Sequence, residues 1–288
     1  AEQGDGLPAA SRELALRCAI VGRAVSAEDL AGAFGLDLAD VAAGLEQLAN
    51  DGFLVQQADG YRLRHTSLGE VLREKASHAD RDPLHLAVAR WLVAHDGEAR
   101  EIAVHLEHCP AEPGRADQFR AARADARRAW NLREAHRWSE RCLADPDHEI
   151  ADVVAGAEIS LALGRYASVE AILAEVPPEA EAGLAPAIRS DLAVLRGRLA
   201  LETGHPEEGV ERLYQAEQLG STRPELSWPL TMALCDLGRF AEASIAVISI
   251  PNTVASSEAV SRRPTVKRNA ACSMKRFSSA AISFCLSN

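Results

Sequence analysis

The chain has 288 residues, a formal net charge of −11, 47% hydrophobic residues and only 5% aromatic residues. This length allows two small domains or one extended array. A core with few aromatic residues must be built from Ala, Leu and Val, which suits closely packed helices. Such an acidic chain repels DNA phosphate unless its basic residues gather on one face. No apolar run reaches the roughly 18 residues that span a bilayer.

The cysteines show neither a CxxC pair nor a regular framework, so we expect reduced thiols in a cytoplasmic protein. They are Cys18, Cys109, Cys142, Cys235, Cys272 and Cys285. The first four lie in apolar helical stretches and are expected to be buried. The chain begins at Ala1 without a Met or a basic-then-apolar leader. That start fits a fragment of a longer protein at least as well as a processed one.

Residues 11–80 have the layout of a winged-helix domain, and residues 1–10, which contain Gly and Pro, form a lead-in. The first predicted helix ends at Gly22. The second opens at Ser26 with a capping-box-like start, and Gly35 lies beyond its end. Two short helices are therefore predicted before residue 36.

A third helix and a hairpin complete this layout. The third helix runs from about Asp37, with apolar residues on one face at Val41, Leu45 and Leu48. The stretch FLVQQADGYRLR alternates as a strand, a turn at Asp59-Gly60 and a second strand. An amphipathic helix follows at once. Three helices, a hairpin and a further helix are the order of a winged helix.

Residues 116–250 are predicted to form paired helices, after two connecting helices in residues 81–115, the first starting near Pro83. The segments LGRYA and LGRFA are near copies at two helix joints. The joint glycines are Gly164, Gly204 and Gly238, separated by 40 and 34 residues. The aromatic residues after the outer two joints are Tyr166 and Phe240, which we expect in the core. A period near 34 predicts a helical-hairpin solenoid of the tetratricopeptide (TPR) type.

Residues 251–288 change composition abruptly. They are rich in Ser and basic residues, contain one acidic residue, Glu258, and have no helical stripe. One interpretation is a basic tail that binds nucleic acid. We prefer the other, a disordered or out-of-frame end, because the register of the repeats is lost there.

Charge argues against DNA recognition by the winged helix. Its third helix would enter the major groove, where DNA-binding versions carry Arg or Lys. No Lys or Arg occurs from Ala24 to Tyr61. The same span carries acidic residues at Glu28, Asp29, Asp37, Asp40, Glu46, Asp51 and Asp59. These charges would repel phosphate, so the module is predicted to pack against protein.

Three segments carry a resemblance to a known family. LRHTSLGEVL (63–72) is similar to the strand and helix that end its winged helix, GLEQLANDGFL to the helix before the wing, and EIAVHLEHC to a following helix. Over residues 11–250 the chain resembles the middle of STAND-type signalling NTPases. Within that class it is most similar to the large LuxR-type transcriptional activators of actinobacteria, relatives of the maltose-regulon activator. The resemblance implies a transcription-regulation fragment without the family's NTPase and terminal DNA-binding domains.

The resemblance also implies a role for His65. In STAND relatives a histidine at this joint contacts the β-phosphate of ADP and holds the resting state. His65 occupies that position, with Arg64 as a second cation, whereas Thr66 replaces the relatives' aspartate. A ligand that contacts the module in one state shifts the balance between states. The alternative is that His65 is a polar residue capping the following helix, with no ligand.

No GxxxxGK[ST] motif occurs, so we expect no cofactor and no enzymatic activity in this chain, and ATP or ADP only in the parent protein. The expected partners are the parent's NTPase domain and a protein or small-molecule inducer on the repeats, with neither DNA nor membrane bound directly. The alternative is a free-standing TPR-type adaptor that binds protein.

Three further clusters have a plain structural interpretation. His105, His108 and Cys109 could suggest zinc, but an ordinary helix end is preferred because a fourth ligand is lacking. The carboxylates of Glu98, Glu101 and Glu107 are expected on a solvated face. Seven arginines form a basic run: Arg120, Arg123, Arg127, Arg128, Arg133, Arg137 and Arg141. A solvated face is preferred for them over a groove for an acidic partner.

Overall fold

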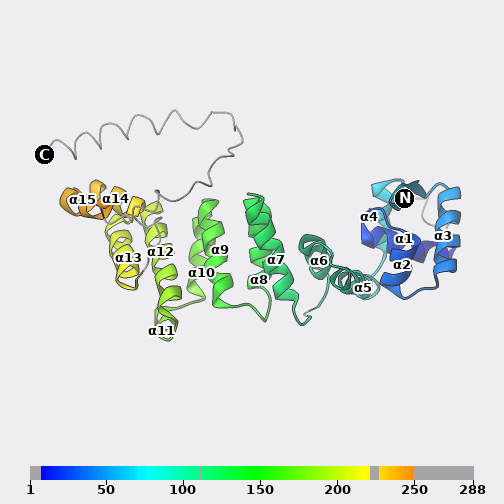
Figure 1. Ribbon diagram of the computed structural model, residues 1–288, viewed down its shortest axis with the longest axis horizontal. Helices are drawn as coiled ribbons and strands as arrows, with labels where there is room; N and C mark the ends of the chain where they lie inside the picture. Colours follow the sequence, from blue (N-terminus) through cyan, green and yellow to red (C-terminus); the bar gives the residue numbers. More distant parts are fainter. Residues whose placement is uncertain (1–7, 111, 221–226, 249–288) are drawn as a thin grey trace, which may run out of the picture. The chain divides into compact units, whose positions relative to one another are not determined.

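The protein is described from a computed structural model, which covers residues 8–110, 112–220 and 227–248 (Figure 1). The described residues are mostly helical, with one two-stranded sheet. Contacts divide the chain into two units, Ala1–Asp152 and Val153–Asn288. The predicted tail at residues 251–288, with Cys272 and Cys285, lies outside the described residues.

The first unit begins with the expected three helices and hairpin. These elements are α1 (Ala9–Val21), α2 (Ala27–Phe34), α3 (Leu38–Asn50), β1 (Leu54–Gln57) and β2 (Gly60–Leu63). Gly22 and Gly35 end the first two helices in the left-handed conformation. The Ser26 hydroxyl accepts the Asp29 N–H at 3.0 Å. The predicted apolar face of α3, at Val41, Leu45 and Leu48, is buried.

The hairpin turn differs from the prediction. Gly60 pairs with Gln57 as the first residue of β2, so the two loop residues are Ala58 and Asp59. Val25 exchanges two backbone hydrogen bonds with Tyr61, of 3.0 and 2.9 Å. A Cβ on Gly60 would lie 2.3 Å from the Val25 carbonyl oxygen. The glycine is needed for this close approach and for its φ of 127°.

Three helices follow the hairpin within the first unit. They are α4 (Thr66–Lys75), α5 (His78–Ala94) and α6 (Ala99–Leu106). The predicted start of α5 near Pro83 is wrong by five residues, because Ser77 and Asp80 form a capping box that starts the helix earlier. Helix α1 packs against α3, α4 and α5, and α5 packs against α6.

Paired helices make up the rest of the described chain. They are α7 (Arg115–Arg128), α8 (Leu132–Leu143), α9 (Ile150–Ala162), α10 (Tyr166–Ala174), α12 (Pro186–Glu202), α13 (Pro206–Gln218), α14 (Ser227–Asp236) and α15 (Phe240–Ile248). A short helix, α11 (Pro178–Glu181), lies between the second and third pairs. This is the architecture of a helical-repeat protein.

The same turn joins all four pairs. Its central residue has a positive φ in each case: Trp130 (57°), Gly164 (70°), Gly204 (86°) and Gly238 (72°). In each turn the next backbone N–H bonds to the carbonyl five residues earlier, at 2.8–2.9 Å. The central residues are separated by 34, 40 and 34 residues, and α11 lies within the longer interval. The three glycines that the sequence analysis names as joints lie in these turns, and Trp130 lies in a fourth.

The prediction that Tyr166 and Phe240 lie in the core is wrong. Phe240 is 50% exposed, and Tyr166 is half-buried with its hydroxyl donating to Glu202 at 3.0 Å. Each is the first residue of a helix directly after its turn, which places it at the edge of the pair. The core of each pair instead uses aliphatic positions deeper in the helix, such as Val169 and Ala243.

The α12–α13 pair has an unusually close backbone approach. Gly197 and Gly209 face each other, and a Cβ on either would lie 3.1 Å from the other's carbonyl oxygen. A Cβ on Gly209 would also lie 2.4 Å from a methyl carbon of Leu201. Leu213 and neighbouring buried residues extend this core toward α14. The two glycines therefore set the spacing of the pair.

Candidate functional site

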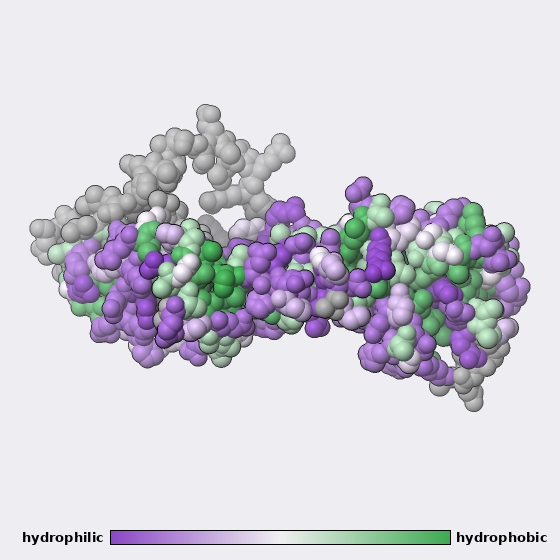
Figure 2. Space-filling view, turned by 90° about the horizontal axis from the view of Figure 1, so that it is seen from below, coloured by the Kyte–Doolittle hydropathy of each residue, from purple (hydrophilic) through white to green (hydrophobic). Residues whose placement is uncertain are grey.

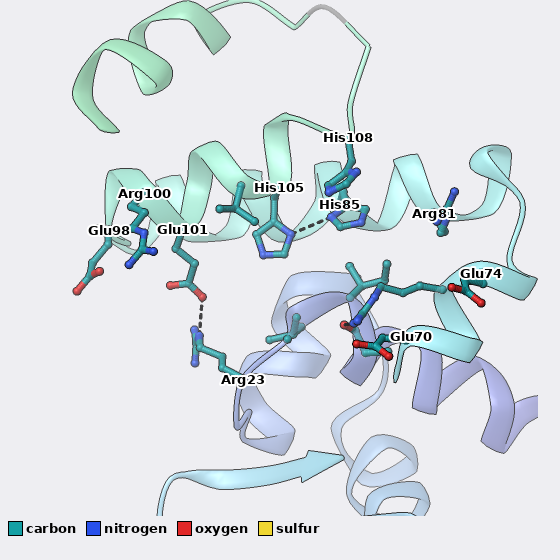
Figure 3. Close-up of a pocket in the computed structure, with 16 residues that line it drawn as sticks. Arg23, Glu70, Glu74, Arg81, His85, Glu98, Arg100, Glu101, His105 and His108 are labelled. Carbon is teal, nitrogen blue, oxygen red and sulfur yellow. Dashed lines mark hydrogen bonds and ion pairs between the residues drawn. The ribbon is translucent and has the colours of Figure 1, made fainter. Parts of the chain in front are cut away.

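A cleft of about 710 Å³ lies in the first unit (Figure 3). One wall is formed by the C-terminal turn of α1 with Gly22 and Arg23, and by α4 through Glu70, Arg73 and Glu74. The other wall comes from α5 and α6. The cleft therefore separates the hairpin-containing module from the α5–α6 pair.

Three histidines line the α5–α6 wall. The Nδ1 atoms of His85 and His105 lie 3.0 Å apart, and His108 stacks on His85 with ring centroids 4.3 Å apart. His85 and His105 are buried, whereas His108 is exposed. Only one of two neutral imidazoles can donate in this contact while the other accepts, so the pair has opposite tautomers at these nitrogens.

Burial makes the paired imidazoles weak bases. Desolvation, with the nearby His108 and His105, lowers the pKa of His85 from 6.5 to about 3. Desolvation also lowers the pKa of His105 to about 4, although the Glu101 carboxylate acts in the opposite direction. Both rings are neutral near pH 7. No set of three His, Cys, Asp or Glu side chains in the described residues could hold a metal ion.

Two arginines hold the elements around the cleft together, one across the cleft and one within a wall. Arg23 Nε donates to Glu101 Oε1 at 2.6 Å, joining the end of α1 to α6. Arg73 Nη1 donates to the Ala19 carbonyl oxygen at 2.6 Å, so α4 caps the C-terminal turn of α1. The cleft is therefore a polar joint between two packed parts. The sequence interpretation missed His85. Its position between Leu84 and Leu86 in an apolar helix could have indicated a buried histidine.

The predicted sensor residues lie elsewhere in the first unit. Arg64 and His65 are both exposed and come directly between β2 and α4. His65 occupies the N-cap position of α4, but its side chain makes no capping hydrogen bond. The simple alternative, a capping side chain, is therefore wrong in this conformation, whereas the sensor role stays a prediction.

Two buried carboxylates form ion pairs with four of the seven arginines. Asp152, whose side chain is 0% exposed, accepts from Arg120 at 2.8 Å and pairs with Arg123 at 2.9 Å. Burial acts to raise the pKa of Asp152, but these contacts and the Glu149 N–H lower it overall. The expectation that these two arginines are solvated is wrong, because the start of α9 carries Asp152 against α7.

Glu107 forms the second such centre. Its side chain is 5% exposed and binds both Arg137 and Arg141, the latter at 2.6 Å. Burial acts to raise the pKa of Glu107, but the two arginines lower it overall. The prediction of a solvated carboxylate is wrong here. Glu107 instead connects the end of α6 to α8.

The cysteine thiols of the first unit are buried, as expected. Desolvation raises the pKa of Cys18 to about 12, and that of Cys109 and Cys142 to about 11. Thiols with such values are poor nucleophiles near neutral pH. They pack as small apolar side chains.

The visible surface is largely hydrophilic with scattered apolar patches (Figure 2). Within the described residues, the large apolar side chains that are exposed are Leu38, Val93, Trp130, Trp228, Met232 and Phe240. Trp130 has the largest exposed fraction, 84%. Among the helices described here, none combines the length and apolar character that crossing a membrane requires.

No protein-family model matches the chain, and no curated protein matches it in sequence. Solved structures that match the fold include the following three. A double mutant of MamA RS-1 has a TM-score of 0.44 at 13% identity, covering 62% of this chain and 99% of that one. MamA from residue 41 of Desulfovibrio magneticus RS-1 has a TM-score of 0.43 at 14% identity, covering 63% and 99%.

The third is a signal transduction ATPase with numerous domains (STAND) with a tetratricopeptide repeat sensor, from Pyrococcus horikoshii. It has a TM-score of 0.47 at 10% identity, covering 85% of this chain and 41% of that one. The present chain thus matches less than half the length of that protein. The repeat architecture itself is carried by the four shared turns of this chain.

Proposed function

We propose that this chain is the signal-transmission arm of a LuxR-type STAND transcriptional regulator. In this proposal residues 11–80 are a winged helix, and the TPR-type repeats bind an inducer or a protein. The chain itself has no catalytic role, and the nucleotide belongs to an NTPase domain of the parent protein. The observation that carries the proposal is the exposed Arg64-His65 pair at the start of α4.

The chemistry of this joint suits a phosphate. Neither side chain has a hydrogen-bond or ion-pair partner within the described residues. The first backbone N–H groups of a helix favour an anion, and α4 has no side-chain cap that would compete for them. A guanidinium and an imidazole beside that helix end can both donate to phosphate oxygens.

Contacts within the first unit supply a route from this joint toward the repeats. Arg73 connects α4 to the end of α1, and Arg23 connects the end of α1 to α6. Glu107 then connects α6 to α8 through Arg137 and Arg141. Because these contacts are directional and partly buried, a displacement of α4 would be transmitted along a packed path.

The acidic surface of α3 supports a role other than DNA binding for this module. Asp37, Asp40 and Glu46 are all exposed. Together with the absence of Lys and Arg from Ala24 to Tyr61, they make the exposed surface of α3 repel phosphate backbones. The same exposed carboxylates are suited to a basic protein surface.

The test is the His65→Ala variant in the longer protein that contains the NTPase domain. We expect bound ADP to dissociate about tenfold faster or more, because a hydrogen bond to a charged group is lost. The matched control is His78→Ala, which removes another exposed histidine near the start of a helix. Unchanged ADP release and unchanged basal activity in His65→Ala would refute the sensor role.

The second candidate is a free-standing TPR-type adaptor that binds protein. It is favoured by the exposed aromatic residues of the paired helices, Trp130, Trp228 and Phe240. These side chains could contact a protein partner without any bound nucleotide. Protein binding by this chain that is independent of any NTPase domain, with no effect of His65→Ala, would favour this candidate.

A further inference from the structure

Trp130 breaks the pattern of the repeat turns. It adopts a φ of 57° at the position that glycine occupies in the other three turns. A bulky L-residue is strained in this left-handed region, because its Cβ approaches the following carbonyl oxygen. Glycine would avoid this cost.

Burial does not offset that cost. The Trp130 side chain is 84% exposed, the largest exposed fraction of any large apolar residue in the described chain. By contrast, Trp138 on α8 is fully buried and stacks with Phe119. A strained and solvent-exposed tryptophan contributes little to the stability of this fold, so its role lies outside the packing of this chain.

Hydrogen bonds of the turn fix the backbone of Trp130. Its N–H bonds to the Arg127 carbonyl at 3.0 Å, and the next N–H bonds to the Ala126 carbonyl at 2.9 Å. The Asn131 side chain accepts the Glu134 N–H at 3.3 Å and donates to Glu134 Oε2 at 2.7 Å. An aromatic side chain on a rigid turn loses little entropy when a partner covers it.

Positive charge surrounds this tryptophan. Four of the seven arginines are held by Asp152 and Glu107, and the remaining three, Arg127, Arg128 and Arg133, lie within three residues of Trp130. Arg128 pairs with Asp125 at the surface.

Arg133 is exposed and has no ion pair or hydrogen bond within the described residues. The nearest acidic residue on α8, Glu134, is engaged by Asn131 and by Arg100 at 2.5 Å. The turn therefore offers an aromatic face beside one unpaired guanidinium, that of Arg133.

We propose that the α7–α8 turn is a docking site for a short acidic peptide segment that carries an apolar residue. The apolar residue packs on the Trp130 ring, and a neighbouring carboxylate meets Arg133. This inference rests on the protein-binding role proposed above and names the partner's chemistry. A tryptophan next to arginines is the composition that most often dominates binding energy at protein interfaces.

Nucleic acid and membranes are less suitable partners. A chain with a net charge of −11 repels a long polyanion or an anionic membrane beyond the turn itself. A short acidic segment contacts only the turn and avoids that repulsion. Membrane-binding surfaces also use several apolar anchors, whereas the described α7–α8 turn offers one tryptophan, Trp130.

The experiment uses the full chain as bait for a display library of random 12-residue peptides. Selected peptides are then measured by fluorescence anisotropy against the wild type, Trp130→Gly and Arg133→Glu. We expect them to be enriched in Asp and Glu around an apolar residue, and each variant to weaken binding tenfold or more. The control is Trp228→Ala, which removes an exposed tryptophan from α14 and should change the affinity less than twofold.

Folding is checked with the same variants. Trp130→Gly should raise the thermal midpoint by about 2 °C or more, because it restores the residue that the turn favours. A lowered midpoint would show that Trp130 packs within the fold and would overturn the proposal.

Failure to select any peptide, selection of neutral or basic peptides, or unchanged affinity in Trp130→Gly would also overturn it. So would Trp130-dependent binding only to phosphatidylserine vesicles or to an oligonucleotide. Peptides that bind Trp130→Gly as well as the wild type would refute this site while leaving protein binding by the repeats intact.

Discussion

Stability of the first unit should fall as the pH is lowered from about 7.5 to about 5, because two buried histidines must remain neutral. An unfolded histidine titrates near 6.5, whereas His85 and His105 in the folded chain titrate near 3 and 4. Between these values the unfolded state binds more protons. Their contribution is therefore present in full above about pH 6.5 and is lost as the pH falls.

The expected size follows from the distance below the unfolded pKa. At about pH 5 each unfolded imidazole is about 1.5 pH units below its pKa, which corresponds to about 2 kcal/mol per histidine. The pair should therefore cost the first unit about 4 kcal/mol relative to about pH 7.5. The paired carboxylates Asp152 and Glu107, whose pKa values are lowered, act at more acidic pH and do not contribute to this window.

The assay is amide hydrogen exchange of the α5 and α6 peptides, because it reports the first unit separately from the second. In His85→Asn the amide can still hydrogen-bond to His105 Nδ1 but cannot take up a proton, so the loss should fall to about 2 kcal/mol. The exposed His78→Asn serves as the control and should retain the full dependence. A flat profile in the wild type, or an equal slope in His85→Asn, would refute this account of the pair.

The remaining predictions concern stability and DNA. Asp152→Ala should destabilise the first unit by about 3–5 kcal/mol in urea unfolding, because two arginines lose a buried partner; Asp117→Ala, at an exposed partner of Arg120, should cost under about 1 kcal/mol. An equal effect of the two would contradict the assigned network. Gly197→Ala should cost the second unit about 1–3 kcal/mol. Gly183→Ala should be nearly neutral, because its Cβ would make only an ordinary contact of 3.9 Å with the Ala180 carbonyl oxygen. Labelled duplex DNA should bind the chain no more tightly than about 10⁻⁴ M in anisotropy, and tight, salt-sensitive operator binding would refute the role assigned to α3.

Local signals in the sequence were enough to place most helices. Gly22, Gly35 and Ser26 each mark a helix end by a property of one residue, a left-handed conformation or a capping hydroxyl. The Asp59-Gly60 prediction was displaced by one residue for a non-local reason, since Gly60 is required by the Val25 backbone rather than by the turn. Periodicity and caps report neighbours in sequence, and strand register also depends on distant backbone.

Buried charge was the main feature that the sequence concealed. Asp152 and Glu107 lie among other charged residues in the sequence, and nothing local separates them from solvated carboxylates. Their burial follows from pairing with arginines that are 32 and 30 residues away along the chain, Arg120 and Arg137. Long-range pairs of this kind depend on how the helices stack, so composition alone assigned all seven arginines to one solvated face.

The turn at Trp130, in contrast, can be predicted from the 34-residue period of the sequence. It lies 34 residues before Gly164, the same interval that separates Gly204 from Gly238. A residue that contradicts the conformational preference of its position is informative when local rules hold elsewhere. Three turns have glycine at the residue with positive φ, and the first turn has Trp130 instead, next to arginines. We therefore expect that selection for a property other than folding acted at this first turn. The same argument predicts that replacing Gly238 by Trp would strain α14–α15 without creating a binding site, because the positive charge found around Trp130 is reduced there by the Arg239–Glu242 pair.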